Sequence, residues 1–98
     1  MSEFAKSLSV TASALKAQAT RLRHVSENIS NADTPGYRRK TIPFEAVRDL
    51  SNDTEMVKAG RVRLDQSELE KIYDPSHPLA DASGHYQSSN VDLMIEIA

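Results

Sequence analysis

Large apolar residues recur at intervals of seven along the first thirty residues of the chain. Leu8, Leu15, Leu22 and Ile29 follow this spacing, and Val25 fills an intermediate position. A seven-residue repeat is typical of the narrow contact line of a coiled coil, in which one helix packs against another. The pattern predicts an amphipathic helix within residues 1–33. We call these five residues, Leu8, Leu15, Leu22, Val25 and Ile29, the apolar seam.

Two partners for the seam are compatible with this periodicity. The helix could pack on the rest of its own domain, or it could pack against helices of other subunits. Small residues on the helix, among them Ala12 and Ala19, would let a partner helix approach closely. A helix with four large apolar side chains is marginal alone, because those side chains need a surface that buries them.

The stretch 28–40, NISNADTPGYRRK, predicts a helix end followed by a sharp reversal. Thr34 precedes Pro35, and the residue before a proline is disfavoured in the α region, so the helix should end by Asp33. Pro35 and Gly36 suit the two central positions of a type II turn. Ser2 is the expected N-cap at the other end of the helix.

Residues 34–89 predict a turn followed by a small β-rich segment. Over 37–42 the residues Tyr37, Arg39 and Thr41 alternate with Arg38, Lys40 and Ile42, which indicates a strand that Pro43 ends or confines to an edge. Residues 45–50 are compatible with one helical turn or a loop. Residues 55–64 suggest a hairpin that turns at Ala59-Gly60.

The last third of the chain predicts a short strand, a long loop and a second helix. Residues 69–73 suit a strand, and 74–86 contain two prolines and a glycine, which favours a turn-rich loop. Asn90 is the expected cap of a helix over 90–98. Its apolar face has only begun at Ala98, so we expect this C-terminal helix to be truncated. The predicted fold class is α+β.

Composition predicts a modest core. The 98 residues are 39% hydrophobic and 5% aromatic, which suits one small domain with limited burial. The absence of cysteine excludes disulfides and thiolate chemistry. We expect neither a cleaved signal peptide nor direct membrane insertion, because charged residues interrupt every apolar run.

Three histidines and their neighbouring acids do not form a recognisable metal motif. His77 and His85 share the loop with Asp74 and Asp81, and His24 lies on the helix. No His-x-x-x-His pair and no cysteine accompanies them, so we expect turn-forming roles and no metal or cofactor.

Catalysis and nucleic-acid binding are both disfavoured. No Gly-x-Ser-x-Gly or Ser-x-x-Lys pattern occurs, and the acidic pair Glu68 and Glu70 implies no pocket, so we expect no enzyme and no small-molecule substrate. Arg38, Arg39 and Lys40 could contact phosphates, but the following residues look extended and supply no recognition helix. A small nucleic-acid-binding module is the alternative from another class.

The stretch 14–40 resembles the signature of the axial proteins of the bacterial flagellum, the family that builds its rod and hook. Ser30 stands where the family usually has Ala. The residues that match are Leu15, Ala17, Arg21, Leu22, Ser26, Asn28, Ile29, Asn31, Thr34, Pro35, Gly36, Tyr37 and Arg38.

A second stretch, 72–98, is similar to the block before the C-terminal helix in proximal rod members of this family. The residues that match are Tyr73, Asp74, Pro75, His77, Pro78, Ala80, Asp81, Gly84, Tyr86, Asn90 and Val91. Sister axial rod proteins and rod-adaptor proteins are the alternatives within the family.

The resemblance implies a structural subunit of the rod, the drive shaft that carries torque from the membrane ring to the hook. It implies a helix at 1–33 in the rod core, an outward β-rich segment at 34–89 and the start of a second helix at 90–98. It also implies flagellar type III export without a cleaved signal peptide and a location in the periplasm-spanning basal body. The implied partners are copies of the chain, other rod proteins, membrane-ring proteins and rod-adaptor proteins.

Charge divides unevenly between the two parts of the chain. Residues 1–40 carry seven Lys/Arg and three Asp/Glu, a balance of +4, whereas residues 41–98 carry five and eleven, a balance of −6. Opposite charges of this kind suit contact between copies. We therefore expect Arg38, Arg39 and Lys40 to lie at a subunit boundary, with Arg39 and Lys40 facing the acidic part of a neighbour.

Overall fold

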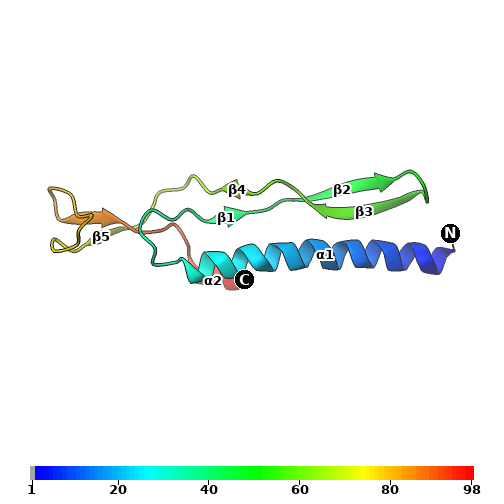
Figure 1. Ribbon diagram of the computed structural model, residues 1–98, viewed down its shortest axis with the longest axis horizontal. Coiled ribbons are helices and arrows are strands. Elements are labelled where there is room, and N and C mark those ends of the chain that lie inside the picture. Colours follow the sequence, from blue (N-terminus) through cyan, green and yellow to red (C-terminus); the bar gives the residue numbers. More distant parts are fainter. Residues whose placement is uncertain (1) are drawn as a thin grey trace. The chain divides into compact units, whose positions relative to one another are not determined.

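The N-terminal helix is the longest element of the computed structural model, which describes residues 2–98. Helix α1 spans Glu3–Ser30 (Figure 1). The hydroxyl of Ser2 accepts a hydrogen bond from the backbone N–H of Ala5 at 3.1 Å, so Ser2 is the N-cap as predicted. The helix ends within the limit that the sequence indicated, three residues before Asp33.

The predicted turn after α1 is confirmed. Gly36 has a φ of +76°, and the N–H of Tyr37 donates to the carbonyl of Thr34 at 3.1 Å, which closes a four-residue turn. A positive φ at the third position is the requirement of a type II turn, and glycine meets it without a steric penalty.

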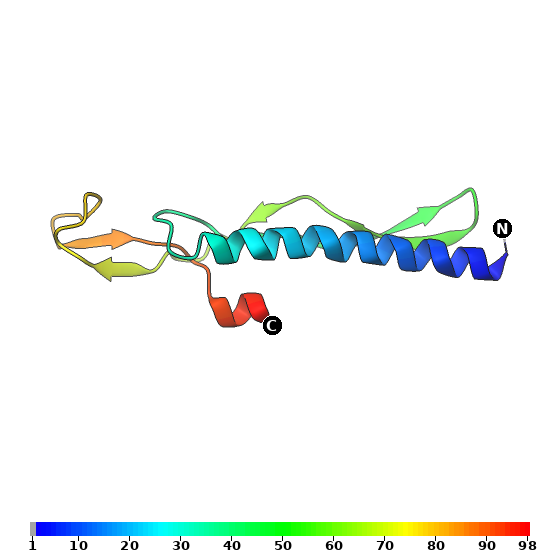
Figure 2. The ribbon, with the colours of Figure 1, turned by 60° about the horizontal axis from the view of Figure 1, so that its bottom comes forward.

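The strands form three separate two-stranded ladders. Strand β1 (Lys40–Thr41) pairs with β4 (Arg63–Leu64), and β2 (Phe44–Asp49) is antiparallel to β3 (Thr54–Ala59). Strand β5 (Lys71–Tyr73) is antiparallel to β6 (His85–Gln87), as the yellow-green and orange arrows of Figure 2 show. Together with the short helix α2 (Leu93–Ile97), these ladders confirm the α+β class.

The central hairpin lies earlier in the chain than predicted. Residues 44–49 form strand β2 rather than a helical turn or loop, and the hairpin turns at residues 50–53 rather than at Ala59-Gly60. The turn suits its residues, because Asp49 accepts hydrogen bonds from the N–H and hydroxyl of Ser51, and Asp53 adopts a φ of +53°. Gly60 instead allows a close approach, since a side chain there would meet Glu45 and Pro43.

Three further predictions need correction. The strand expected over 37–42 is reduced to β1, because the N–H of Arg39 donates to a side chain, that of Asn90, instead of to a neighbouring strand. The loop expected over 74–86 ends earlier, because His85 and Tyr86 join β6. The N-cap of α2 is Asp92, whose carboxylate accepts a bond from the Met94 N–H at 3.0 Å, and not Asn90.

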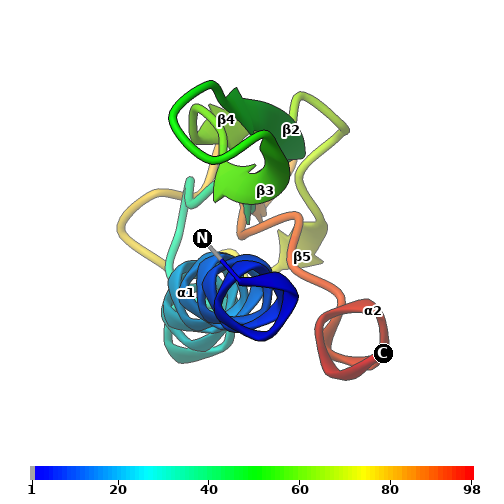
Figure 3. The same cartoon turned by 90° about the vertical axis from the view of Figure 1, so that its right-hand side faces the viewer.

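The chain divides into two compact units. The first unites α1 up to His24 with Thr41–Arg63, and the second unites Val25–Lys40 with Leu64–Ala98. In the first unit the hairpin lies beside α1, with β3 between β2 and the helix in the view along α1 (Figure 3). The N–H of Val57 on β3 donates to the hydroxyl of Ser13 at 3.1 Å. The small residues on this face of α1 let the strand approach.

Candidate functional site

The apolar seam is exposed along α1. The exposed fractions are 55% for Leu8, 67% for Leu15, 58% for Leu22 and 41% for Ile29, and Val25 is half-buried. The hairpin of the first unit covers a different face of the helix, where Ala17 is only 2% exposed. The predicted alternative, in which the seam packs on the chain's own domain, is therefore wrong for these four large side chains.

Buried residues in this chain are mostly polar. Among the residues that the structure describes, Ala17 is the sole buried hydrophobic residue, whereas five polar or charged residues are buried: Asn28, Thr54, Ser88, Ser89 and Glu96. A soluble domain normally gains most of its stability from apolar burial. Here the apolar side chains that could supply it lie at the surface.

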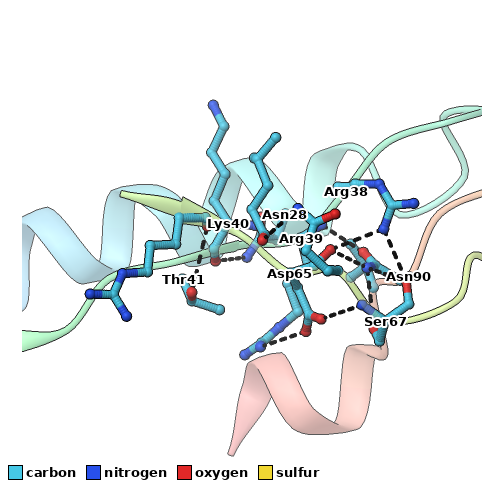
Figure 4. A network of polar contacts seen from close by, with 12 residues as sticks. Asn28, Arg38, Arg39, Lys40, Thr41, Asp65, Ser67 and Asn90 are labelled. Carbon is cyan, nitrogen blue, oxygen red and sulfur yellow. Dashed lines mark hydrogen bonds and ion pairs between the residues drawn. The ribbon is translucent and has the colours of Figure 1, made fainter. Parts of the chain in front are cut away.

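Asn28 is the centre of a polar network in the second unit, which we call the Asn28 network (Figure 4). Its side chain is fully buried and makes four hydrogen bonds. The amide group donates to the carbonyl of Lys40 at 2.9 Å and to the carboxylate of Glu96 at 3.2 Å. The amide oxygen accepts from the N–H of Lys40 at 2.9 Å and from the hydroxyl of Tyr37 at 2.8 Å. Every hydrogen-bonding position of the amide is used.

Glu96 is the second buried member of the network. Its side chain is 1% exposed and forms an ion pair with the guanidinium of Arg39. Arg39 also lies 3.6 Å from a carboxylate oxygen of Asp65. A buried carboxylate is costly unless it is paired and hydrogen-bonded, and Glu96 meets both conditions through Arg39 and Asn28.

Lys40 and Arg38 likewise have partners within the chain. The ammonium of Lys40 lies 2.5 Å from the carboxylate of Glu27, and this bond raises the pKa of Lys40. Arg38 donates to the backbone carbonyls of Asp65 and Ser67 at 3.2 and 3.0 Å. The three charges therefore have partners inside the second unit. The expected place of Arg38, Arg39 and Lys40 at a subunit boundary stays a prediction.

Asn90 joins three segments of the second unit. Its side-chain oxygen accepts from the N–H of Arg39 at 2.6 Å, and its amide group donates to the carbonyls of Asp65 and Ser67 at 2.9 and 3.2 Å. Sequence reasoning missed the roles of Asn90, Asp65 and Glu96. No local signal marks their long-range contacts, since Asn90 lies 51 residues from Arg39 and Glu96 lies 68 residues from Asn28. Asp65 also has a local partner, because it accepts from the N–H of Ser67 two residues away.

The turn motif holds the end of α1 against the segment before α2. It comprises Asn28, Asn31, Thr34, Pro35, Gly36, Tyr37 and Arg38. The N–H of Gly36 donates to the carbonyl of Ser88 at 2.9 Å, and the hydroxyl of Ser89 donates to the carbonyl of Ala32. Thr34 donates its hydroxyl to the side-chain oxygen of Asn31 at 3.1 Å. The motif thus builds a junction as well as a helix end.

The loop histidines stabilise turns and ring contacts. The ring of His77 stacks on Tyr86 with centroids 3.8 Å apart, and its Nδ1 accepts from the N–H of Leu79 at 3.1 Å. His85 meets Tyr73 edge to face at 5.1 Å. Across residues 2–98 the side chains offer no cluster of three or more His, Cys, Asp or Glu suited to a metal ion.

Over the same residues, no helix has the length and apolar character needed to cross a membrane.

Comparison with known proteins identifies the family. The family described as "Flagella basal body rod protein" matches residues 8–38, which include all five seam residues and the turn motif. The flagellar basal-body rod protein FlgC of Agrobacterium fabrum is 43% identical over 96 residues, covering 91% of this chain and 69% of the relative. The chain belongs to the FlgC family of flagellar basal-body rod proteins.

Other FlgC proteins match over similar lengths. FlgC of Bacillus subtilis is 33% identical over 113 residues, covering 93% of this chain and 75% of the relative. FlgC of Salmonella typhimurium is 34% identical over 94 residues, covering 90% of this chain and 70% of the relative. These matches extend through the middle segment, so the resemblance that the two sequence blocks indicated is confirmed at the level of the FlgC family.

Proposed function

We propose that this chain is a structural subunit of the flagellar rod and that its apolar seam packs against helices of neighbouring subunits. One observation carries the proposal: four large apolar side chains of the seam are exposed, whereas only one hydrophobic residue is buried among the described residues. Burial of an aliphatic side chain stabilises by about 1.5–3 kcal/mol. Neighbouring subunits would supply that burial and would order α1 in the assembly.

The rod core, the outward surface and the partners follow from this role. The region 1–33 would contribute its helix α1 to the core, the region 34–89 would be the outward β-rich segment, and the region 90–98 would begin a second core helix. The partners are copies of the chain, other rod proteins, membrane-ring proteins and rod-adaptor proteins. The subunit transmits torque from the membrane ring to the hook, catalyses no reaction and needs no cofactor.

The location in the basal body and the route to it agree with this role. The rod spans the periplasm, and the flagellar type III apparatus exports the subunit without a cleaved signal peptide. The Asn28 network would hold the junction between the core helix and the outward segment in one geometry, which a torque-carrying part requires. Arg39 and Lys40 lie at the edge of this junction, where a neighbour's acids could compete for them.

The test replaces one seam residue in a flagellated host that lacks its own FlgC-family protein. Leu15→Asp should prevent incorporation of the chain into purified basal bodies and abolish swimming, because a carboxylate cannot be buried in an apolar contact. Leu79→Asp is the matched control: Leu79 is 63% exposed, close to the 67% of Leu15, but lies in the loop between β5 and β6.

The outcomes distinguish an error about the contact surface from an error about the function. Mass spectrometry of the basal bodies measures incorporation of each variant. If Leu15→Asp assembles as well as Leu79→Asp, the seam is not the contact surface. If the unsubstituted chain is itself absent from basal bodies and does not restore swimming, the proposed function is wrong.

A further inference from the structure

The first unit contains an apolar groove on a face of α1 that the seam does not use. The groove has a volume of about 840 Å³ and lies between α1 and residues 42–62. Its apolar lining includes Ala17, Met56 and Val57. A groove of this size accommodates several side chains.

Charge around the groove is predominantly positive. Lys16, Arg23 and Lys58 line it, and none of its lining residues is acidic. One carboxylate, that of Glu45, lies next to the groove against Gly60 and opposite Lys58 in the strand register. The occupant that fits is therefore an apolar side chain flanked by acidic residues.

The tip of the β2–β3 hairpin has this chemistry. Leu50 is 86% exposed, the largest value among the exposed large hydrophobic residues. Asp49 precedes it, and Asp53 follows at the other end of the turn. Arg48 forms an ion pair with Asp53, and the segment 48–55 still carries a net charge of −2 from one arginine and three acids. Leu50 does not line the groove of its own copy.

We propose that the hairpin tip of one copy docks into the groove of a second copy, with Leu50 on the apolar floor and Asp49 near Lys16 or Lys58. The hairpin tip and the groove are different surfaces of one unit, so the contact is head-to-tail, and each copy can use its free tip or groove to bind a further copy. This proposal rests on the proposed function and adds to it a second contact, independent of the seam.

The test uses disulfide trapping between two preparations of the full chain, which has no native cysteine. One preparation carries Ser51→Cys at the hairpin tip, and the other carries Ser9→Cys in the groove. Ser7→Cys replaces Ser9→Cys in the control, because Ser7 lies two residues away on α1 and is not among the groove residues. We expect the mixed disulfide to form several-fold faster with Ser9→Cys.

Two further substitutions test the chemistry of the contact. Leu50→Ser in the Ser51→Cys chain should lower the trapping rate about tenfold or more, because burial of a leucine side chain corresponds to at least one factor of ten in an equilibrium constant. Lys16→Glu in the groove chain should also lower it, whereas Lys6→Glu, outside the groove, should not.

Equal trapping at Ser7→Cys and Ser9→Cys, or trapping that is insensitive to Leu50→Ser, would overturn the proposal. Neither result bears on incorporation into basal bodies, so the rod function would stand. If the unsubstituted chain is absent from basal bodies but the trapping results are as expected, the groove contact exists and the proposed function is wrong.

Discussion

At the residue scale, Asn28 explains why the second unit folds with so little apolar burial. A buried amide whose four hydrogen bonds are all made gives the structure one defined arrangement, because any other arrangement leaves polar groups unpaired. Burial of the Tyr37 hydroxyl, followed by the nearby charge of Glu27, raises the pKa of Tyr37, so this side chain stays a donor to Asn28. The sequence places Asn28 at a helix end and in the family signature, but it does not indicate the four partners of its side chain.

Replacement of Asn28 should destabilise the fold. Asn28→Ala leaves the backbone N–H of Lys40 and the carboxylate of Glu96 short of a partner, at a cost of about 1–3 kcal/mol for a buried unsatisfied group. Urea unfolding of the full chain, followed by circular dichroism, measures the change. Asn31→Ala is the control, because Asn31 is half-buried and bonds only to residues within four positions. Equal losses for the two variants would contradict the central role of Asn28.

Asp65 should make stability depend on acidic pH. Hydrogen bonds from the N–H and hydroxyl of Ser67, and then the charge of Arg39, hold the pKa of Asp65 below its ordinary value of 3.8. A carboxylate with a lowered pKa in the folded state contributes stability that is present above pH 3.8 and is lost as the pH falls through the folded-state pKa. Asp65→Asn should remove this contribution.

Unfolding curves at a series of pH values between neutral and strongly acidic test the Asp65 prediction. The stability of Asp65→Asn should fall less on acidification than that of the unsubstituted chain. Glu68→Gln supplies the comparison, since Glu68 is an exposed carboxylate in the same segment. An acid response that is identical for all three chains would rule out the contribution of Asp65.

At the element scale, turns decide where strands pair. The prediction of a hairpin turn at Ala59-Gly60 is wrong, because Asp49, Ser51 and Asp53 form the turn instead, through side-chain hydrogen bonds and a positive φ. The turn at Pro35-Gly36 was predicted correctly, because proline and a required positive φ are local properties. Periodicity also located α1 correctly, since it extends over many turns of helix.

Substitution at Gly36 should weaken the junction after α1. Gly36→Ala places a Cβ at a φ of +76°, where no neighbouring atom lies within 4 Å, so the cost is backbone strain of about 1–2 kcal/mol and not a clash. Gly36→Asn should cost less, because asparagine tolerates this conformation. Thermal unfolding of the three chains checks the order. A Gly36→Asn variant no better than Gly36→Ala would argue against strain as the cause.

At the scale of the whole molecule, the chain behaves as a part of an assembly. Its described residues bury one hydrophobic side chain and keep the seam, the Leu50 tip and most of α2 at the surface, with Met94 77% and Ile97 75% exposed. The stability of each unit therefore depends heavily on polar contacts and on one helix face. Under the proposed function, neighbouring subunits would complete this burial in the rod.

Hydrogen exchange should distinguish the free chain from the assembled one. In the free chain the amides of the first turns of α1 should exchange rapidly, because few buried contacts support them, while the N–H of Lys40, bonded to buried Asn28, should exchange slowly. In basal bodies the α1 amides should become protected by about a factor of ten or more, since each 1.4 kcal/mol of added stability is tenfold in the opening equilibrium. Unchanged exchange along α1 would contradict burial of the seam.

Sequence by itself determined the features that depend on neighbouring residues or on regular spacing. The heptad spacing of the seam, the N-cap at Ser2, the turn at Pro35-Gly36 and the family signature are all local patterns, and local geometry dictates their conformations. Tertiary structure alone decided which groups meet: Glu96 with Arg39, Asn90 with Arg39 and Asp65, and β2 with β3. The reason is that a buried charge or amide selects its partner by completing its hydrogen bonds in three dimensions, which no spacing along the chain records.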